Sequence, residues 1–267
     1  MSASMCALTG AGKGKYKFLA VIEHPAGADA PGLPAEAATA VPPDLTLAES
    51  AARRLRRDIL AGSLPPAARL RLRDLSAQYG LGATPLREAL SRLAAEGLVT
   101  LEGQKGFSVP PVTRAHLLDI TRSRQVAEPE ALRLAMAEGG AAWEDGIVAT
   151  LSLLRHEVGR RAPESTAWLD RYEARHHAFH RALIAGCGLP SLRRFCDDLY
   201  VQKTRYRRVT GSAYADWPAV QAAHEGLAAA ALARDPGAPA LLSRHIGTTA
   251  DQLLALLGEA PLPPARA

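Results

Sequence analysis

The sequence predicts a mainly α-helical protein, in which a small N-terminal unit ending in a β-hairpin precedes a larger, all-helical antiparallel bundle. Three observations support this prediction. Ala and Leu dominate a composition that is 48% hydrophobic but only 5% aromatic, which favours helices over sheet. Apolar residues recur at helical spacing through most of the chain after residue 46. Gly or Pro separates these repeats, as is typical at helix ends.

The chain divides into four predicted segments. Residues 1–44 are rich in Ala, Pro and Gly without a sustained period, so we expect a disordered leader, or residues upstream of the natural start. Residues 45–112 are expected to form the N-terminal unit, residues 113–258 the bundle, and residues 259–267 a frayed tail. Two domains suit a chain of 267 residues, because a domain usually takes roughly 100–200 residues.

Start and stop signals delimit three helices in the N-terminal unit, at about residues 46–61, 72–79 and 84–96. Gly62 ends the first helix, and the glycine-containing turn at residues 80–82 follows the second. Thr84 is predicted to N-cap the third helix, with Pro85 at the first helical position and Gly97 after the last turn.

A β-hairpin is predicted after the third helix, from residues 98–102 and 107–110 around the tip at residues 103–106. This order of helices, turn and hairpin is that of a winged helix-turn-helix, which places one helix in the DNA major groove. Between residues 47 and 112, ten Lys/Arg outnumber six Asp/Glu, and such a local positive surface attracts a phosphate backbone. The sequence therefore predicts double-stranded DNA as a partner.

The residues expected to contact DNA lie on the second and third helices and at the tip of the hairpin. Arg87 is the candidate for reading bases, because a guanidinium can bond O6 and N7 of guanine at once. Arg73 and Thr84 are placed for phosphates or adjacent bases. Lys105 and Gly106, at the hairpin tip, can reach the minor groove or the backbone.

The motifs of residues 47–110 resemble those of the GntR family of bacterial transcription regulators. The resemblance rests on Gly62-x2-Pro65-Pro66-x3-Leu70, Asp74-Leu75, Thr84-Pro85-Leu86-Arg87-Glu88-Ala89-Leu90-x2-Leu93-x2-Glu96-Gly97-Leu98-Val99 and Gly106-Phe107-x-Val109. Ala83 departs from it, because the family's usual Arg at that position contacts the operator. The resemblance thus implies that recognition depends more on Arg73, Arg87 and the wing than is usual in the family.

Six helices are predicted in the second domain, at residues 114–138, 142–160, 166–185, 190–208, 218–234 and 236–257. His176 and His180 lie four residues apart and share a helix face, whereas His177 is expected to face solvent. His224 and His245 lie on the last two helices, so the four patterned histidines can converge in the bundle core. Imidazoles so arranged favour Zn²⁺ or Ni²⁺; the alternative is that they are scattered surface residues.

The second domain also resembles the effector-binding FCD domain of the FadR-type subgroup. The resemblance rests on Arg124-x2-Ala127-Glu128-Pro129-x-Ala131, Phe179-His180-Arg181-Ala182-Leu183, Ala223-His224-Glu225 and Arg244-His245. It implies metal ligation by His180, His224 and His245, with His176 at the position where the family has an Asp. Neutral imidazole in place of carboxylate leaves a divalent metal less neutralised, so such a centre should favour an anionic ligand. The predicted effector is a small organic acid, held by the metal and by Arg124.

The predicted function is that of a ligand-responsive transcription regulator, a homodimer on a palindromic operator, because one recognition helix reads few bases. Two alternatives remain: a constitutive DNA-binding protein with a purely structural bundle, and a metalloenzyme using Glu225 or Glu173 as a general base. Three cysteines without CxxC spacing and the absence of a long apolar run predict a soluble, cytoplasmic protein with no membrane partner.

Overall fold

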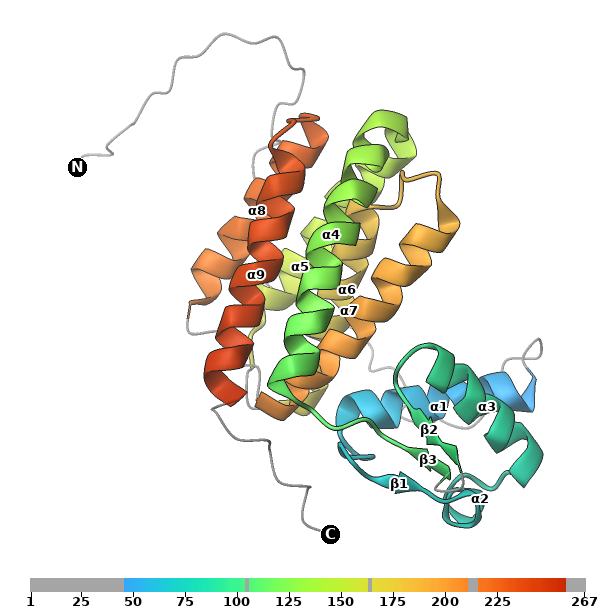
Figure 1. The fold of residues 1–267 in the computed structure, drawn as a ribbon. Coiled ribbons are helices and arrows are strands. Elements are labelled where there is room, and N and C mark those ends of the chain that lie inside the picture. The colour runs from blue at the N-terminus through green and yellow to red at the C-terminus, as the bar shows by residue number, and fades with distance from the viewer. Residues whose placement is uncertain (1–45, 104–105, 163–164, 211–215, 258–267) are drawn as a thin grey trace, which may run out of the picture. The chain divides into compact units, whose positions relative to one another are not determined.

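A computed structural model describes residues 46–103, 106–162, 165–210 and 216–257. The predicted leader, Lys105 and the predicted tail lie outside the described residues. The described chain is mainly helical, and both predicted architectures are present, a winged helix-turn-helix and an all-helical bundle (Figure 1). Among the described residues, no helix is both long enough and apolar enough to cross a membrane.

The winged helix-turn-helix contains, in chain order, α1 (Leu47–Ala61), β1 (Arg69–Leu70), α2 (Leu72–Tyr79), α3 (Ala83–Ala95), β2 (Thr100–Glu102) and β3 (Gly106–Ser108). Helix α1 begins with a capping box, in which the Thr46 side chain accepts from the Glu49 backbone N–H and the Glu49 side chain accepts from that of Thr46. It ends at Gly62, whose φ of 83° suits a residue without Cβ.

The start of α3 differs from the prediction. Gly82 occupies the N-cap position and the helix begins at Ala83, so Thr84 is inside the first turn and Pro85 is its third residue. Proline is tolerated there because the first N–H groups of a helix have no intrahelical acceptor in any case. The N-cap therefore supplies no side-chain hydrogen bond, and the Thr84 hydroxyl is not used for capping.

The wing is a three-stranded antiparallel sheet in the order β1-β3-β2, rather than the two-stranded hairpin that the sequence predicts. Phe107 of the central strand pairs with Leu70 on one side and with Leu101 on the other. The additional strand, β1, is only two residues long, which is too short to show the alternation that marks a strand in a sequence.

Leucine side chains of α3 form the centre of the small domain's core. Leu86, Leu90 and Leu93 are fully buried and pack with Leu55 of α1 and Leu98. Replacing Leu90 with Ala is expected to lower the free energy of unfolding of this domain by about 3 kcal/mol, through lost transfer energy and a residual cavity. Urea unfolding followed by circular dichroism measures the change, with Ser91→Ala on the exposed side of α3 as the control. Equal stabilities of the two variants would contradict the core assignment.

The bundle contains, in chain order, α4 (Arg114–Glu138), α5 (Ala141–Gly159), α6 (Thr166–Leu183), α7 (Pro190–Thr210), α8 (Trp217–Leu232) and α9 (Ala238–Leu257). These are the six helices that the sequence predicts, with ends shifted by up to two residues at each terminus. Thr113, Ser165 and Asp216 cap the N-termini of α4, α6 and α8 through side-chain oxygens. Figure 1 shows α4 and α9 side by side along the bundle.

Candidate DNA-binding face and histidine cluster

Helix α3 presents a polar face on the side opposite its leucines. Thr84, Arg87, Glu88 and Ser91 are exposed and follow helical spacing, so they share one face. Arg87 forms no ion pair or hydrogen bond with another described residue, which leaves its guanidinium available. Ser91 is a further candidate that the sequence analysis did not single out, because an isolated serine in a helix has no motif to mark it.

Of the other predicted DNA contacts, Arg73 is exposed and Gly106 is half-buried. Arg73 of α2 is exposed and only 3.3 Å from Asp74 Oδ1, an ion pair too solvated to hold the side chain in place. Gly106 begins β3 with a φ of 79°, a conformation that favours glycine. Lys105, the predicted wing-tip cation, lies outside the described residues.

Helix α6 carries a column of aromatic rings into the bundle core. Trp168, Tyr172, His176 and His180 follow one another every four residues and are all buried. The rings of Trp168 and Tyr172 stack with centroids 5.5 Å apart, and so do those of Tyr172 and His176. This column fixes the direction of the two histidines, since each ring is packed against the one before it.

The column ends in a cluster of four imidazoles. One ring nitrogen from each of His176, His180, His224 and His245 lies within 4.8 Å of the others. The Nε2 atoms of His176 and His224 are 2.9 Å apart, so one of them donates a hydrogen bond to the other. His176 and His180 come from α6, His224 from α8 and His245 from α9, and the convergence expected from their positions is therefore present.

Burial keeps these imidazoles uncharged. It lowers the pKa of His176, His180 and His224 well below the usual value, with smaller contributions from neighbouring histidines and cations. Burial, followed by the charges of Arg124, Lys203 and Arg207, lowers the pKa of His245 to about 4. Neutral imidazole is the form that binds a metal ion.

The cluster fits a metal ion on two further grounds. Both ring nitrogens of His180 are buried without a hydrogen-bond partner among the described residues, a state that costs free energy unless something else binds them. The Nδ1 atom of His176 is hydrogen-bonded to the Tyr200 hydroxyl, which orients the ring and leaves Nε2 directed at the cluster. Nitrogen ligands of one ion lie within about 4 Å of each other, so small rotations suffice.

Charged side chains from α4 and α7 surround the cluster. Arg124, the predicted carboxylate clamp, is buried, and its Nε and Nη2 atoms donate to the two carboxylate oxygens of Glu128 at 2.5 and 3.1 Å. Arg207 is also buried and donates to Glu173. Lys203 is only 3% exposed and lies 4.4 Å from the centroid of the Tyr200 ring.

The sequence does not predict Lys203, Arg207 or Tyr200 as site residues. Basic residues on a helix are usually solvated, and nothing in the pattern of α7 marks these two as buried. Their spacing from Tyr200, at three and seven residues, is compatible with one helix face, and that is the only signal the sequence offers.

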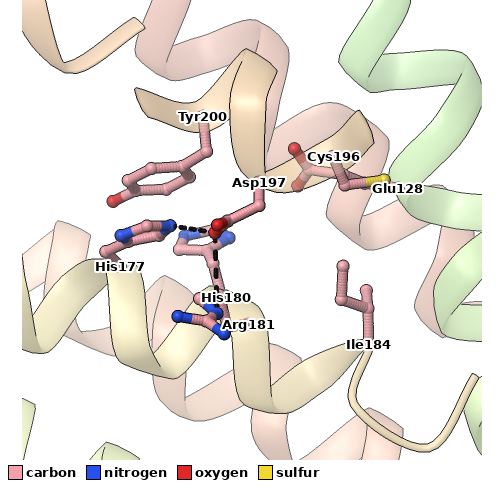
Figure 2. Close-up of a pocket in the computed structure, with 8 residues that line it drawn as sticks. All are labelled: Glu128, His177, His180, Arg181, Ile184, Cys196, Asp197 and Tyr200. Carbon is pink, nitrogen blue, oxygen red and sulfur yellow. Dashed lines mark hydrogen bonds and ion pairs between the residues drawn. The ribbon is translucent and has the colours of Figure 1, made fainter. Parts of the chain in front are cut away.

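His177 does not simply face solvent, as its position on α6 predicts. Its Nε2 atom lies 2.6 Å from Asp197 Oδ1, and its ring stacks on that of Tyr200 with centroids 4.3 Å apart. Figure 2 shows His177 and Arg181 both directed at Asp197. These three residues and His180 are among those that line a small recess. The recess, of about 10 Å³, holds about one water molecule.

Comparison with known proteins identifies two family domains in this chain. The profile of the bacterial regulatory proteins of the gntR family matches residues 47–109, and that of the FCD domain matches residues 119–248. The chain is 39% identical over 199 residues to the HTH-type transcriptional repressor GlaR of Escherichia coli K12, covering 73% of this chain and 90% of GlaR. It is 35% identical over 190 residues to the HTH-type transcriptional regulator BphR of Paraburkholderia xenovorans LB400, covering 71% and 78%.

The solved structure of E. coli McbR/YncC shares the fold, with a TM-score of 0.65 at 23% identity over 78% of this chain and 97% of that chain. The relatives are transcription regulators, which are not enzymes, so the metalloenzyme alternative is wrong. The chain is a DNA-binding transcription regulator with an FCD domain, and it belongs to the GntR family, in the FadR-type subgroup.

Proposed function

We propose that this regulator is ligand-responsive, and that a metal ion and a small organic acid bound at the histidine cluster alter its affinity for an operator. The observation that carries the proposal is the buried group of four neutral imidazoles, in which both nitrogens of His180 lack a partner among the described residues. A purely structural core has no reason to bury four imidazoles together, because apolar side chains would fill the same space at lower cost.

His176, His180, His224 and His245 would hold the ion, which we propose to be Zn²⁺ or Ni²⁺, the borderline cations that accept imidazole. When bound, the metal supplies a positive charge and positions for an anionic oxygen ligand. The side chains around it favour the same ligand class. Arg124 lies near enough for its charge to depress the pKa of the His180 and His245 imidazoles, after the larger effect of burial.

We propose that the DNA-binding form is a homodimer on a palindromic operator, acting in the cytoplasm. One α3 helix reads too few bases for a specific site, and a second copy supplies the missing affinity. The effector changes this affinity only if it binds the DNA-bound and released conformations unequally.

Replacing Arg87 with Ala is expected to weaken specific DNA binding by about 10- to 100-fold, because a bidentate contact to guanine contributes about 1–3 kcal/mol of discrimination. Fluorescence anisotropy with a fragment from upstream of the gene measures the dissociation constant. Arg92→Ala is the matched control, since Arg92 is on the same helix but is paired with Glu49 of α1 at 3.3 Å. Equal losses in the two variants would contradict base reading by Arg87.

The proposed response is tested by repeating the anisotropy titration after chelation, after reconstitution with Zn²⁺ or Ni²⁺, and with a panel of small carboxylic acids. We expect the reconstituted protein to change its operator affinity about 5- to 150-fold in the presence of an effective acid. A metal-free preparation should not respond. Identical affinity under all these conditions would favour the alternative, a constitutive DNA-binding protein with a structural bundle.

A further inference from the structure

Lys203 of α7 is a buried cation that the proposed function does not yet use. It is 3% exposed, and none of the ion pairs among the described residues involves its ammonium. Burial lowers the pKa of Lys203 well below its usual value, and the charges of Glu173 and Glu128 oppose this lowering in part. Its ammonium nitrogen lies 4.4 Å from the centroid of the Tyr200 ring. Burial of an ammonium is unfavourable unless an anion lies beside it.

The two carboxylates near Lys203 are already engaged by other cations. Glu128 accepts from Arg124 through both oxygens, and Glu173 accepts from Arg207. Since the imidazoles are neutral, the charged side chains described around the cluster are three basic ones, of Arg124, Lys203 and Arg207, and two carboxylates, of Glu128 and Glu173. A divalent metal would add further positive charge. Lys203 is the basic side chain of the three whose charge is not balanced by a bonded carboxylate.

Lys203 also lies close to all four imidazoles. Burial is the main reason that their pKa values are low, and the charge of Lys203 contributes to the lowering at each one. Tyr200 connects the two groups, because its ring faces the ammonium while its hydroxyl is hydrogen-bonded to His176. An anion placed at the cluster is thus within reach of Lys203.

We propose that Lys203 binds the carboxylate of the effector beside the metal, as the principal cation for that group, with Arg124 held in place by Glu128. The inference rests on the proposed function and names the residue that recognises the anion. Arg124 then has a different role, because its two hydrogen bonds to Glu128 hold the α4 side of the pocket in place. The ligand class is a small carboxylate.

The test uses full-length protein loaded with Co²⁺, whose visible spectrum reports on the ligands of the metal, and acetate as the probe. Lys203→Met removes the charge at nearly constant volume. We expect it to retain Co²⁺ and to bind acetate about 10- to 100-fold more weakly than the unaltered chain, as for loss of a charged hydrogen bond. Arg194→Met removes a cation from the exposed face of α7 and should leave the acetate affinity unchanged.

Three results would overturn the inference. Equal acetate affinity in Lys203→Met and the unaltered chain would show that another group binds the anion. No spectral response of the unaltered Co²⁺ protein to acetate at about 100 mM would show that the site does not take a carboxylate. A lower midpoint of thermal unfolding with an unchanged acetate response would show that Lys203 stabilises the fold and does not bind the anion.

Failure of the proposed function has a different signature, because the unaltered chain would then bind no Co²⁺ at all. Should Lys203→Met not fold, Lys203→Gln provides the same comparison, since it also removes the charge but keeps a polar group. Lys203→Arg retains the charge and is expected to keep acetate binding within about tenfold of the unaltered chain.

Discussion

Replacing His180 with Ala is expected to lower the metal affinity of the protein by at least about 100-fold, so that purified protein contains little metal. The reason is that bound zinc contributes roughly 10–16 kcal/mol in structural zinc sites, of which one ligand supplies a substantial share. His180 is the sharpest test among the four histidines because neither of its nitrogens has another role among the described residues. Metal content by mass spectrometry and competition with a chelating dye give the affinity.

The matched control for this prediction is His177→Ala. His177 lies three residues before His180 on α6. His177 contacts Asp197 and Tyr200 but does not belong to the cluster, so its loss should leave the metal content unchanged. Both variants remove an imidazole from the same helix, which separates ligation from a general effect on α6. An unchanged metal content in His180→Ala would end the metal proposal.

Acidification is expected to destabilise the metal-free protein strongly between pH 7 and pH 5.5. In the folded chain, burial lowers the pKa of each clustered histidine below its ordinary value of about 6.5. The pKa of His245 falls to about 4. The unfolded chain therefore binds more protons below pH 6.5, and stability falls as the pH falls. Each histidine contributes about 1 kcal/mol per pH unit in this window, so the total is a few kcal/mol of the roughly 5–15 available.

Urea unfolding of chelated protein at several pH values checks the size and the sign of this effect. His245→Gln should reduce the slope of stability against pH, because glutamine does not titrate. The slope for the metal-loaded protein should be about the same in this window, because the folded imidazoles are uncharged with or without the metal. A stability that does not change between pH 7 and pH 5.5 would contradict the burial of neutral imidazoles.

Local patterns account for most of the fold that the sequence predicts. The Thr46–Glu49 capping box and Gly62 delimit α1 through contacts within a few residues, and such contacts are readable along the chain. The prediction that Thr84 is the N-cap of α3 is wrong. Thr84 is a residue type that favours N-caps, but the turn after Gly80 places Gly82 at the N-cap position. Strand β1 is two residues long and exists through its pairing with β3, a partner distant in sequence.

The histidine cluster divides in the same way. The four-residue spacing of His176 and His180 is a local property, and the places of His224 and His245 on the last two predicted helices, together with the family resemblance, indicate them as partners. Their low pKa values, by contrast, arise from burial. The environment of Lys203 also depends on the tertiary structure, since a lysine on a helix becomes buried only when neighbouring helices cover it.

By itself the sequence determined the two domains' architectures, the regulator family and the identity of the clustered histidines, because periodicity, caps and motifs are encoded in neighbouring residues. Only the tertiary structure decided which charged groups are buried and what lies beside them: Arg207 pairs with Glu173 of another helix, and Lys203 is covered beside Tyr200. These contacts lie in a medium of low dielectric constant. There, a difference of a few ångströms in packing decides whether a cation is satisfied internally or binds a ligand.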